Sequence, residues 1–265
     1  MKNILLLVHG DAGQEARLQA ALDIVRAVEG HLTCLDVAVT PVMADDGYGA
    51  FEMLMLEERQ REAANRATLE PRLAAEGLPW SWIDAAGDLS VCLAAAAGLA
   101  DLIVVNRALD ISPLPGMQGV VGEVLKSAGK PILAVPESSR GIRLAGHAMI
   151  AWDGSDQASA ALRAAVPLLR FAQRVTIVEV DDGSLAIPAV DAAAYLSRHD
   201  IGATVHPISR VAKGTAGEIL TLVELMRPDY LVMGGFGHGR LREALFGGVT
   251  WRMLSDSPVA LLLAH

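Results

Sequence analysis

One order of apolar runs and turns occurs twice in this chain, and this repeat constrains the fold more than any other feature. The first set of apolar runs, separated by stretches of helical periodicity, spans residues 4–8, 32–39, 80–85, 102–105 and 132–135. Strands that alternate with helices are typical of a parallel sheet with crossover helices. The first part of the chain therefore predicts an α/β fold.

The same order begins again after a polar, turn-forming linker at residues 136–146. Residues 148–155 repeat the pattern of residues 5–12, and the runs that follow are at residues 174–180, 203–209, 229–233 and 258–263. A linker of this composition between two equivalent units predicts a domain boundary. We expect two domains, at residues 1–138 and 144–265.

The spacing between the copies shows where they differ. Asp11 and Asp153 are 142 residues apart, whereas Gly87 and Gly214 are 127 apart, so the first copy carries 15 extra residues between its second and third strands. A charged stretch with helical periodicity, residues 51–76, lies there. The sequence therefore predicts a long helix in the first copy alone.

Composition restricts the classes of function. The formal net charge of -9 argues against nonspecific nucleic-acid binding, which needs a basic surface. The longest apolar run, residues 91–105, is interrupted by Asp101. It is also too short to span a membrane, which takes about 18 residues. The first residues lack the apolar length of a signal peptide, so we expect a cytoplasmic protein.

Cys34 and Cys92 match no metal-binding spacing and are expected to be reduced thiols.

A glycine-rich stretch follows the apolar run at residues 230–233. Four of its glycines, Gly234, Gly237, Gly247 and Gly248, have the spacing G-x2-G-x9-G-G. Glycine allows sharp turns and close approach to a ligand, and backbone N–H groups in such a turn bind anions. The spacing fits neither the Walker A loop nor the dinucleotide fingerprint. Both a phosphate-binding loop and a purely structural loop remain open on these residues alone.

Three features of the second copy together resemble a known family. They are Ala-Trp-Asp-Gly-Ser at residues 151–155, the glycine spacing, and Ser-Pro-Val-Ala-Leu-Leu at residues 257–262. This combination resembles a universal stress protein domain of the adenine-nucleotide-binding type, and the repeat makes the chain similar to a tandem universal stress protein. The resemblance implies two doubly wound domains of the adenine nucleotide alpha hydrolase-like fold. Each would have a five-stranded parallel sheet with helices on both faces.

The resemblance also implies a site for ATP or AMP in the second domain, with Mg²⁺ present only as a companion of ATP. The matching positions are Ala151, Asp153, Val180, Met233, Gly234, Gly237, Gly247, Gly248 and Val249. Asp153 would lie beside the nucleoside, and the backbone of Ala151 and Val180 would contact the base. Asp153 could instead cap the following helix, because Asp and Ser are strong N-caps.

The second copy departs from the family pattern at one position. The family closes its loop with Gly-Ser or Gly-Thr, whereas this chain has Gly247-Gly248. The lost hydroxyl removes a hydrogen bond worth about 0.5–1.5 kcal/mol net, so weakened binding and no binding both remain open. The Thr250 hydroxyl is the nearest substitute in sequence.

The first copy departs further. Asp11 is retained, but residues 106–109 read Asn-Arg-Ala-Leu where the second copy has its first glycines. We expect this domain to be degenerate for phosphate binding and to serve as a built-in partner. Domains of the family commonly pair through their last strands, which implies that residues 132–135 pair with 259–263. The same habit implies a homodimer of tandem chains.

Two classes of function remain. One is a stress-response module in which an adenine nucleotide tunes contacts with protein partners. The other is a nucleotide-free scaffold or chaperone-like stress protein with a vestigial site. An enzyme is not expected, beyond slow ATP hydrolysis, because no paired carboxylates accompany the loop and there is no G-x-S-x-G motif.

Overall fold

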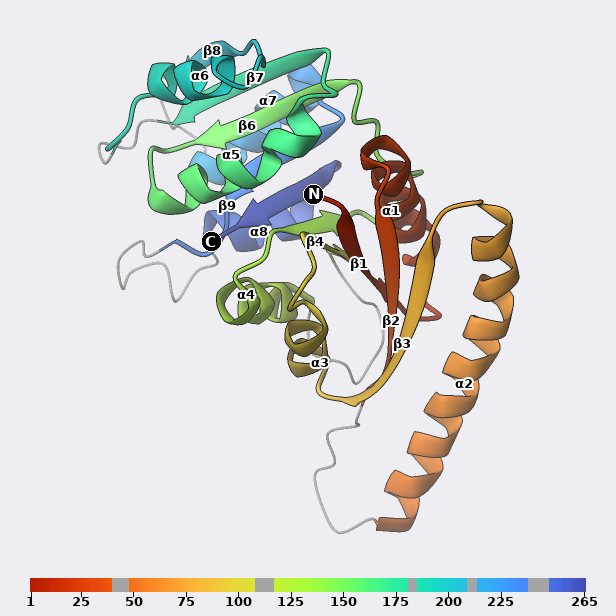
Figure 1. The fold of residues 1–265 in the computed structure, drawn as a ribbon. Coiled ribbons are helices and arrows are strands. Elements are labelled where there is room, and N and C mark those ends of the chain that lie inside the picture. Colours follow the sequence, from red (N-terminus) through yellow and green to blue (C-terminus); the bar gives the residue numbers. More distant parts are fainter. Residues whose placement is uncertain (40–47, 108–116, 181–184, 209–213, 238–247) are drawn as a thin grey trace.

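The computed structural model describes residues 1–39, 48–107, 117–180, 185–208, 214–237 and 248–265. Ten strands form one sheet (Figure 1). They are β1 (Asn3–Val8), β2 (His31–Val39), β3 (Trp80–Gly87), β4 (Leu102–Asn106), β5 (Ile132–Val135), β6 (His147–Trp152), β7 (Arg174–Val180), β8 (Thr204–Ile208), β9 (Tyr230–Gly234) and β10 (Ala260–Ala264). Their order in the sheet is β3-β2-β1-β4-β5-β10-β9-β6-β7-β8.

The two halves of the sheet meet at their last strands. β5 and β10 pair antiparallel, with Leu133 opposite Leu262, and the remaining neighbours pair parallel. The predicted pairing of the last strands is thereby confirmed within a single chain. Because this one junction is antiparallel, the carboxyl ends of β1–β5 and those of β6–β10 lie on opposite edges of the sheet.

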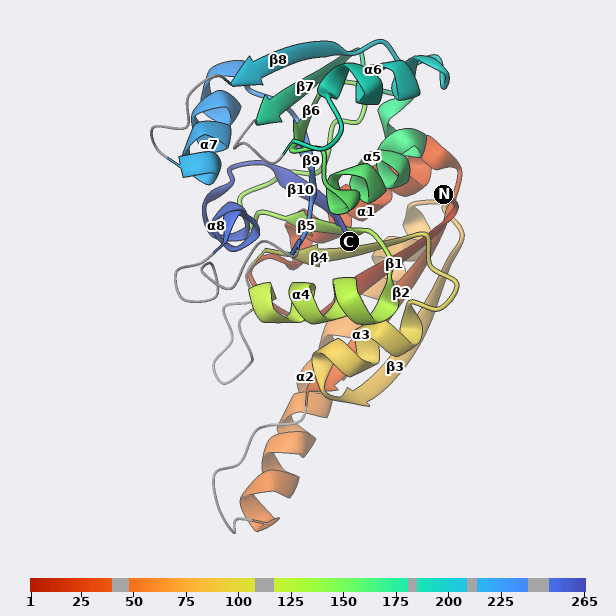
Figure 2. The same ribbon diagram turned by 90° about the vertical axis from the view of Figure 1, so that its left-hand side faces the viewer.

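Helices cover both faces, as predicted for a doubly wound α/β fold. They are α1 (Gln14–Val28), α2 (Tyr48–Ala75), α3 (Leu89–Ala96), α4 (Met117–Ala128), α5 (Asp156–Leu169), α6 (Ala189–Ser197), α7 (Gly214–Met226) and α8 (Val249–Asp256). Figure 2 shows α7 and α8 on one side of the second half's strands and α5 and α6 on the other. The predicted domain boundaries, 1–138 and 144–265, stay a prediction.

Side chains that alternate along the strands form two hydrophobic cores, one on each face of the sheet. In β1, Ile4, Leu6 and Val8 join the core under α1, α2, α5 and α6, whereas Leu5 and Leu7 join the core under α3, α4, α7 and α8. Successive side chains of a strand point to opposite faces, so a strand buried on both faces is apolar throughout. This is why the strands read as continuous apolar runs in the sequence.

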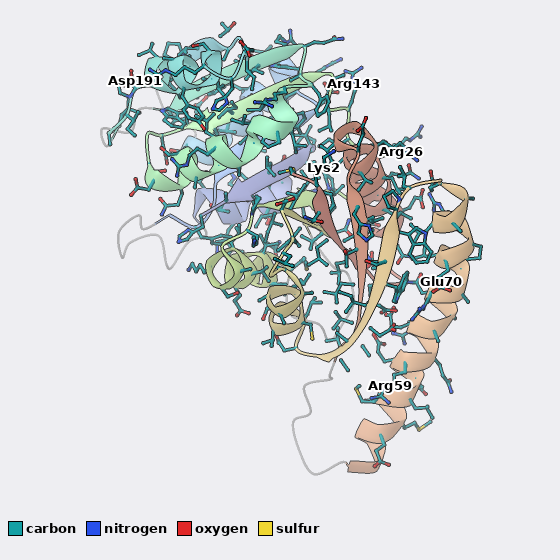
Figure 3. The ribbon with its side chains drawn as sticks, viewed as in Figure 1. Lys2, Arg26, Arg59, Glu70, Arg143 and Asp191 are labelled. Carbon is teal, nitrogen blue, oxygen red and sulfur yellow. The ribbon has the colours of Figure 1, made fainter. Side chains whose placement is uncertain are left out.

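α2 is the long helix predicted from the insertion in the first copy. Its C-terminal part packs on the sheet through Leu69 and Leu73, which are buried. Its N-terminal part extends past the sheet (Figure 1), where Met53 and Leu56 are exposed. The charged residues Arg59 and Glu70 lie on this helix (Figure 3). Among the described residues of α2, the apolar side chains of the C-terminal part are therefore the ones that meet the sheet.

Candidate functional site

The residues predicted to contact a base lie at the carboxyl edge of the second half. Ala151 on β6 is in register with Met233 on β9 and with Val178 on β7. Val180 is two residues further along β7 and ends that strand. The structure therefore places Ala151, Val180 and Met233 on three neighbouring strands at one edge, where open α/β sheets bind ligands.

Asp153 begins the turn between β6 and α5. Its Oδ1 accepts a hydrogen bond from the Ser155 N–H at 3.0 Å, and Gly154 between them has φ +73°. The helix cap is Ser155, whose hydroxyl oxygen accepts from the Ala158 N–H at 3.1 Å. The Asp153 carboxylate is left exposed beside the strand edge. Of its two predicted roles, capping of α5 belongs to Ser155.

Gly234 ends β9 where that strand passes very close to the start of α5. A Cβ on Gly234 would lie 2.7 Å from the Ala158 backbone nitrogen, closer than any side chain tolerates. Glycine is therefore required here for packing of strand against helix, whether or not a ligand binds. A Cβ on Gly237 would instead meet the Gln157 Oε1 at 3.3 Å, the end of a flexible side chain.

The start of the glycine-rich stretch turns at an unexpected residue. The left-handed backbone conformation belongs to Phe236, at φ +51°, and not to Gly237. The Phe236 ring packs edge-on against Trp251 of α8 with ring centroids 6.1 Å apart. It also fills the space beside Gly122 of α4, where a Cβ would lie 3.1 Å from the ring. This packing across the two halves holds a non-glycine residue in a conformation that costs free energy.

The end of the glycine-rich stretch is the start of α8. Gly248 is the N-cap residue and supplies no side-chain cap, and Val249 begins the helix. Gly247 lies outside the described residues. The hydroxyl of Thr250, considered as a substitute phosphate donor, accepts a hydrogen bond from the Phe236 N–H at 3.1 Å. Thr250 therefore joins the two ends of the stretch.

The equivalent region of the first half is filled by a buried arginine. Arg17 is fully buried and donates to the carbonyl oxygens of Leu7 and His9, both at 2.7 Å. Its Nη1 donates to Asp11 Oδ1 at 2.7 Å and to Asn106 Oδ1. Asp11 is thus engaged by a charge-assisted pair. Asp11 and Asn106 are the equivalents of Asp153 and Gly234, and the degeneracy of the first half for phosphate binding stays a prediction.

Sequence reasoning identified Asp11 as retained and Asn106 as a departure from the family pattern, but it missed Arg17. The available signal was an arginine at an apolar-face position of the first helix, six residues after Asp11. Burial of an arginine requires partners for its donors. An aspartate and an asparagine at the ends of neighbouring strands supply them.

A surface hollow lies away from these positions, at the linker. It is lined by Asp23, Arg143, Asp229 and their neighbours, and Figure 3 shows Arg143 between α1 and the second half. Both acidic side chains that line it are paired: Arg143 Nε donates to Asp229 Oδ1 at 2.9 Å, and Asp23 Oδ2 accepts from the Ile142 N–H at 3.0 Å. The hollow therefore lies where the linker contacts its neighbours, and it is not part of the predicted site.

The fold is that of a tandem α/β protein of the adenine nucleotide alpha hydrolase-like class. Residues 146–265 match the model of the universal stress protein family. The second half of the chain is therefore similar to the universal stress protein family, and the first half has the same fold.

Solved structures extend the similarity of fold over the whole chain. A universal stress protein from Archaeoglobus fulgidus DSM 4304 superimposes with a TM-score of 0.74 at 18% identity, covering 99% of this chain and 96% of that one. A functionally unknown protein from Pseudomonas aeruginosa PAO1 superimposes with a TM-score of 0.64 at 17% identity, covering 100% and 92%. No curated protein matches the chain in sequence.

Among the helices of the described residues, none is both long enough and apolar enough to cross a bilayer.

Proposed function

We propose that this protein is a stress-response module whose second half binds an adenine nucleotide, ATP or AMP, and which acts through contacts with other proteins. The observation that carries the proposal is the exposed Asp153 carboxylate beside the backbone edge of Ala151 and Met233. Carboxylates accept hydrogen bonds from hydroxyl groups such as those of a ribose. An adenine base would lie along the edge from Ala151 to Val180.

The phosphates would lie over the glycine-rich stretch, toward the start of α8. The partial positive charge of a helix N-terminus favours anions there. Gly248 leaves this N-terminus without a hydroxyl, so contacts to phosphate would come from backbone N–H groups. Mg²⁺ would accompany ATP only. We propose binding without efficient turnover, and at most slow hydrolysis of ATP.

Calorimetric titration with ATP and with AMP tests the proposal. We expect one nucleotide per chain in the wild type and a loss of at least tenfold in affinity for Asp153→Asn. Asparagine keeps an oxygen that accepts from the Ser155 N–H, so the turn is preserved while the charge is removed. Glu123→Gln, on the exposed surface of α4, is the matched control for loss of one negative charge.

Gly237→Val is a second variant aimed at the phosphates. Gly237 has no left-handed φ and faces only the flexible Gln157 side chain, so the fold should accept valine. The added side chain should block close approach of a phosphate. If the well-folded wild type binds neither nucleotide, the alternative of a nucleotide-free scaffold or chaperone-like protein takes its place, an alternative that Gly248 favours.

The partner most readily tested is a second copy of the chain. We propose a homodimer, with an interface away from β5 and β10, because these strands are already paired with each other. Light scattering should give twice the chain mass of 27.9 kDa. A mass of one chain at all concentrations would contradict the dimer.

A further inference from the structure

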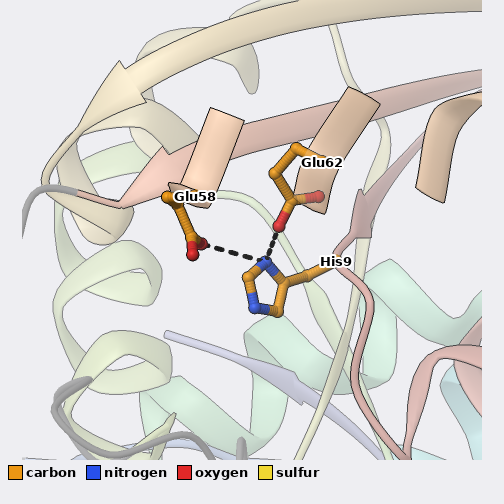
Figure 4. Close-up of side chains that lie close together, drawn as sticks. All are labelled: His9, Glu58 and Glu62. Carbon is orange, nitrogen blue, oxygen red and sulfur yellow. Dashed lines mark ion pairs between the residues drawn. The ribbon is translucent and has the colours of Figure 1, made fainter. Parts of the chain in front are cut away.

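A histidine and two glutamates meet where α2 crosses the end of β1. His9 directly follows β1, and Glu58 and Glu62 are one helical turn apart on α2, so both face the same way. Figure 4 shows both carboxylates directed at the His9 ring. The candidate ligand atoms of the three residues all lie within 4.8 Å of one another.

The group is buried and incompletely hydrogen-bonded. His9 Nδ1 lies 2.5 Å from Glu62 Oε1 and 4.0 Å from Glu58 Oε1. The side chains of His9 and Glu62 are only 4% and 6% exposed. Neither Glu62 oxygen has a hydrogen-bond partner among the described residues, so the short contact to His9 lacks hydrogen-bond direction. Buried carboxylate oxygens without partners are costly.

Acidic side chains outnumber basic ones around this group. A third acidic side chain, Asp36 of β2, is buried on the same face and next to Glu62. Arg61 neutralises only the outer oxygen of Glu58, Oε2, at 2.7 Å. Arg66, the next arginine along α2, is engaged by Glu70 and Asp84.

The backbone next to His9 is held in place by a further contact with α2. The His9 N–H donates to Gln14 Oε1 at 3.0 Å, and Gln14 exchanges two hydrogen bonds with the Asn65 amide at 2.7 and 2.9 Å. Asn65 is three residues after Glu62 on the same helix. The strand end and the helix are thus aligned by contacts that do not use the carboxylates.

We propose that His9, Glu58 and Glu62 bind a divalent transition-metal cation of the Zn²⁺ or Mn²⁺ kind. Imidazole nitrogen with carboxylate oxygens is a donor set that such ions accept, with ligand distances of about 2.0–2.2 Å for Zn²⁺. Binding through Nδ1 puts the ring proton on Nε2. Glu62 must move slightly away from His9, because ligands around one ion lie about 3 Å apart.

The site belongs to the first half alone. At the repeat offset, His9 and Asp36 correspond to Ala151 and Val178, and the second copy has no counterpart of the α2 insertion. The insertion therefore brings two carboxylates to the carboxyl edge of the half in which Arg17 is buried and paired with Asp11. A bound cation would join α2 to the sheet at the end of β1.

The test uses the full chain, stripped of metal by chelation and dialysis. We expect calorimetry to show one Zn²⁺ or Mn²⁺ per chain, with much weaker response to Mg²⁺. Glu62→Gln should lower affinity at least tenfold, and His9→Gln should do the same. The control Glu57→Gln removes an exposed carboxylate one residue from Glu58 on the same helix, and it should bind like wild type.

A spectroscopic measurement separates this site from surface binding. Co²⁺ in place of the ion should give visible absorption in the wild type and Glu57→Gln, and lose it in Glu62→Gln. Removing a buried carboxylate should not unfold the metal-free protein, which circular dichroism checks. Absence of ion binding in the wild type, or binding that Glu62→Gln and His9→Gln leave unchanged, would overturn the proposal and leave a cluster neutralised by protons.

Discussion

Asn106 Nδ2 donates a hydrogen bond to the Gly13 carbonyl oxygen at 3.1 Å, at the point where the second half has Gly234 and Ser155. A Cβ on Gly13 would lie 2.5 Å from that nitrogen. In the first half a side chain on the strand faces a glycine at the helix start. In the second half the strand has the glycine and the helix start has the side chain. The exchange keeps both helices close to the sheet.

Asn106→Gly should destabilise the protein without creating a nucleotide site. Arg17 Nη1 loses one of its two side-chain acceptors, and a buried charged donor without its partner costs about 1–3 kcal/mol or more. Urea unfolding measures the loss. Asn3→Gly, at the exposed start of β1, controls for the intrinsic cost of glycine in a strand. Equal losses in the two variants would contradict a structural role for the Arg17 network.

Gly248→Ser should strengthen nucleotide binding. It restores the hydroxyl at the N-cap of α8, and one added hydrogen bond of about 0.5–1.5 kcal/mol corresponds to roughly two- to tenfold in affinity. Serine and glycine differ by only a few tenths of a kcal/mol as N-caps, so the unfolding free energy should change little. Calorimetry on both proteins checks the first expectation and urea unfolding the second. An unchanged or weaker affinity would mean that the phosphates do not reach α8.

Arg107→Leu should weaken the contact between the halves. Arg107 Nη1 donates to the carbonyl oxygens of Leu254 and Ser255, at 2.7 and 2.6 Å, in the last turn of α8. Hydrogen bonds from a charged group are worth about 1.5–3 kcal/mol, so the variant should lose stability of that order. Chemical unfolding followed at two wavelengths measures the loss of stability and shows whether the halves then unfold separately. Arg107→Lys should lose less, because it keeps the charge near the helix end.

Protonation of His147 should destabilise the protein in mild acid. His147 is buried, its Nδ1 accepts from Arg174 at 3.0 Å, and its Nε2 contacts Thr176 Oγ1 at 2.9 Å. Burial and the nearby Arg174 charge lower the pKa of His147 below its usual 6.5. The unfolded chain then binds a proton that the folded chain does not, so stability falls as the pH drops through 6.5 toward the lower folded value.

This prediction is tested by measuring the midpoint of urea unfolding at a series of pH values from 8 to 5. The wild type should lose stability over this range, and His147→Gln should lose less of it. His206→Gln, which replaces an exposed histidine of β8, is the control. The same pH dependence in all three proteins would show that His147 does not carry the effect.

Most of the fold could be predicted because it rests on local patterns. Apolar runs flanked by turns located the ten strands, and the change in repeat offset located α2 within a few residues. The pairing of β5 with β10 followed from the family resemblance and is confirmed. Periodicity and spacing are read along the chain, so they need no knowledge of which segments meet.

The chemistry of particular side chains depended on contacts between distant segments. From the sequence, Asp153 was a candidate for the cap of α5, and only the tertiary structure assigned the cap to Ser155. Phe236 adopts the left-handed conformation expected of a glycine because α4 and Trp251 hold its ring. Neither outcome is encoded in the spacing of the glycines.

The sequence by itself determined the order of the elements, the repeat and the edge at which the predicted site residues gather, since these follow from period and register. Only the tertiary structure decided that Arg17 pairs with Asp11 and Asn106 and that α2 brings Glu58 and Glu62 to His9, 49 or more residues away in the chain. Burial and charge neutralisation act through space, and a carboxylate becomes costly only when folding removes it from water.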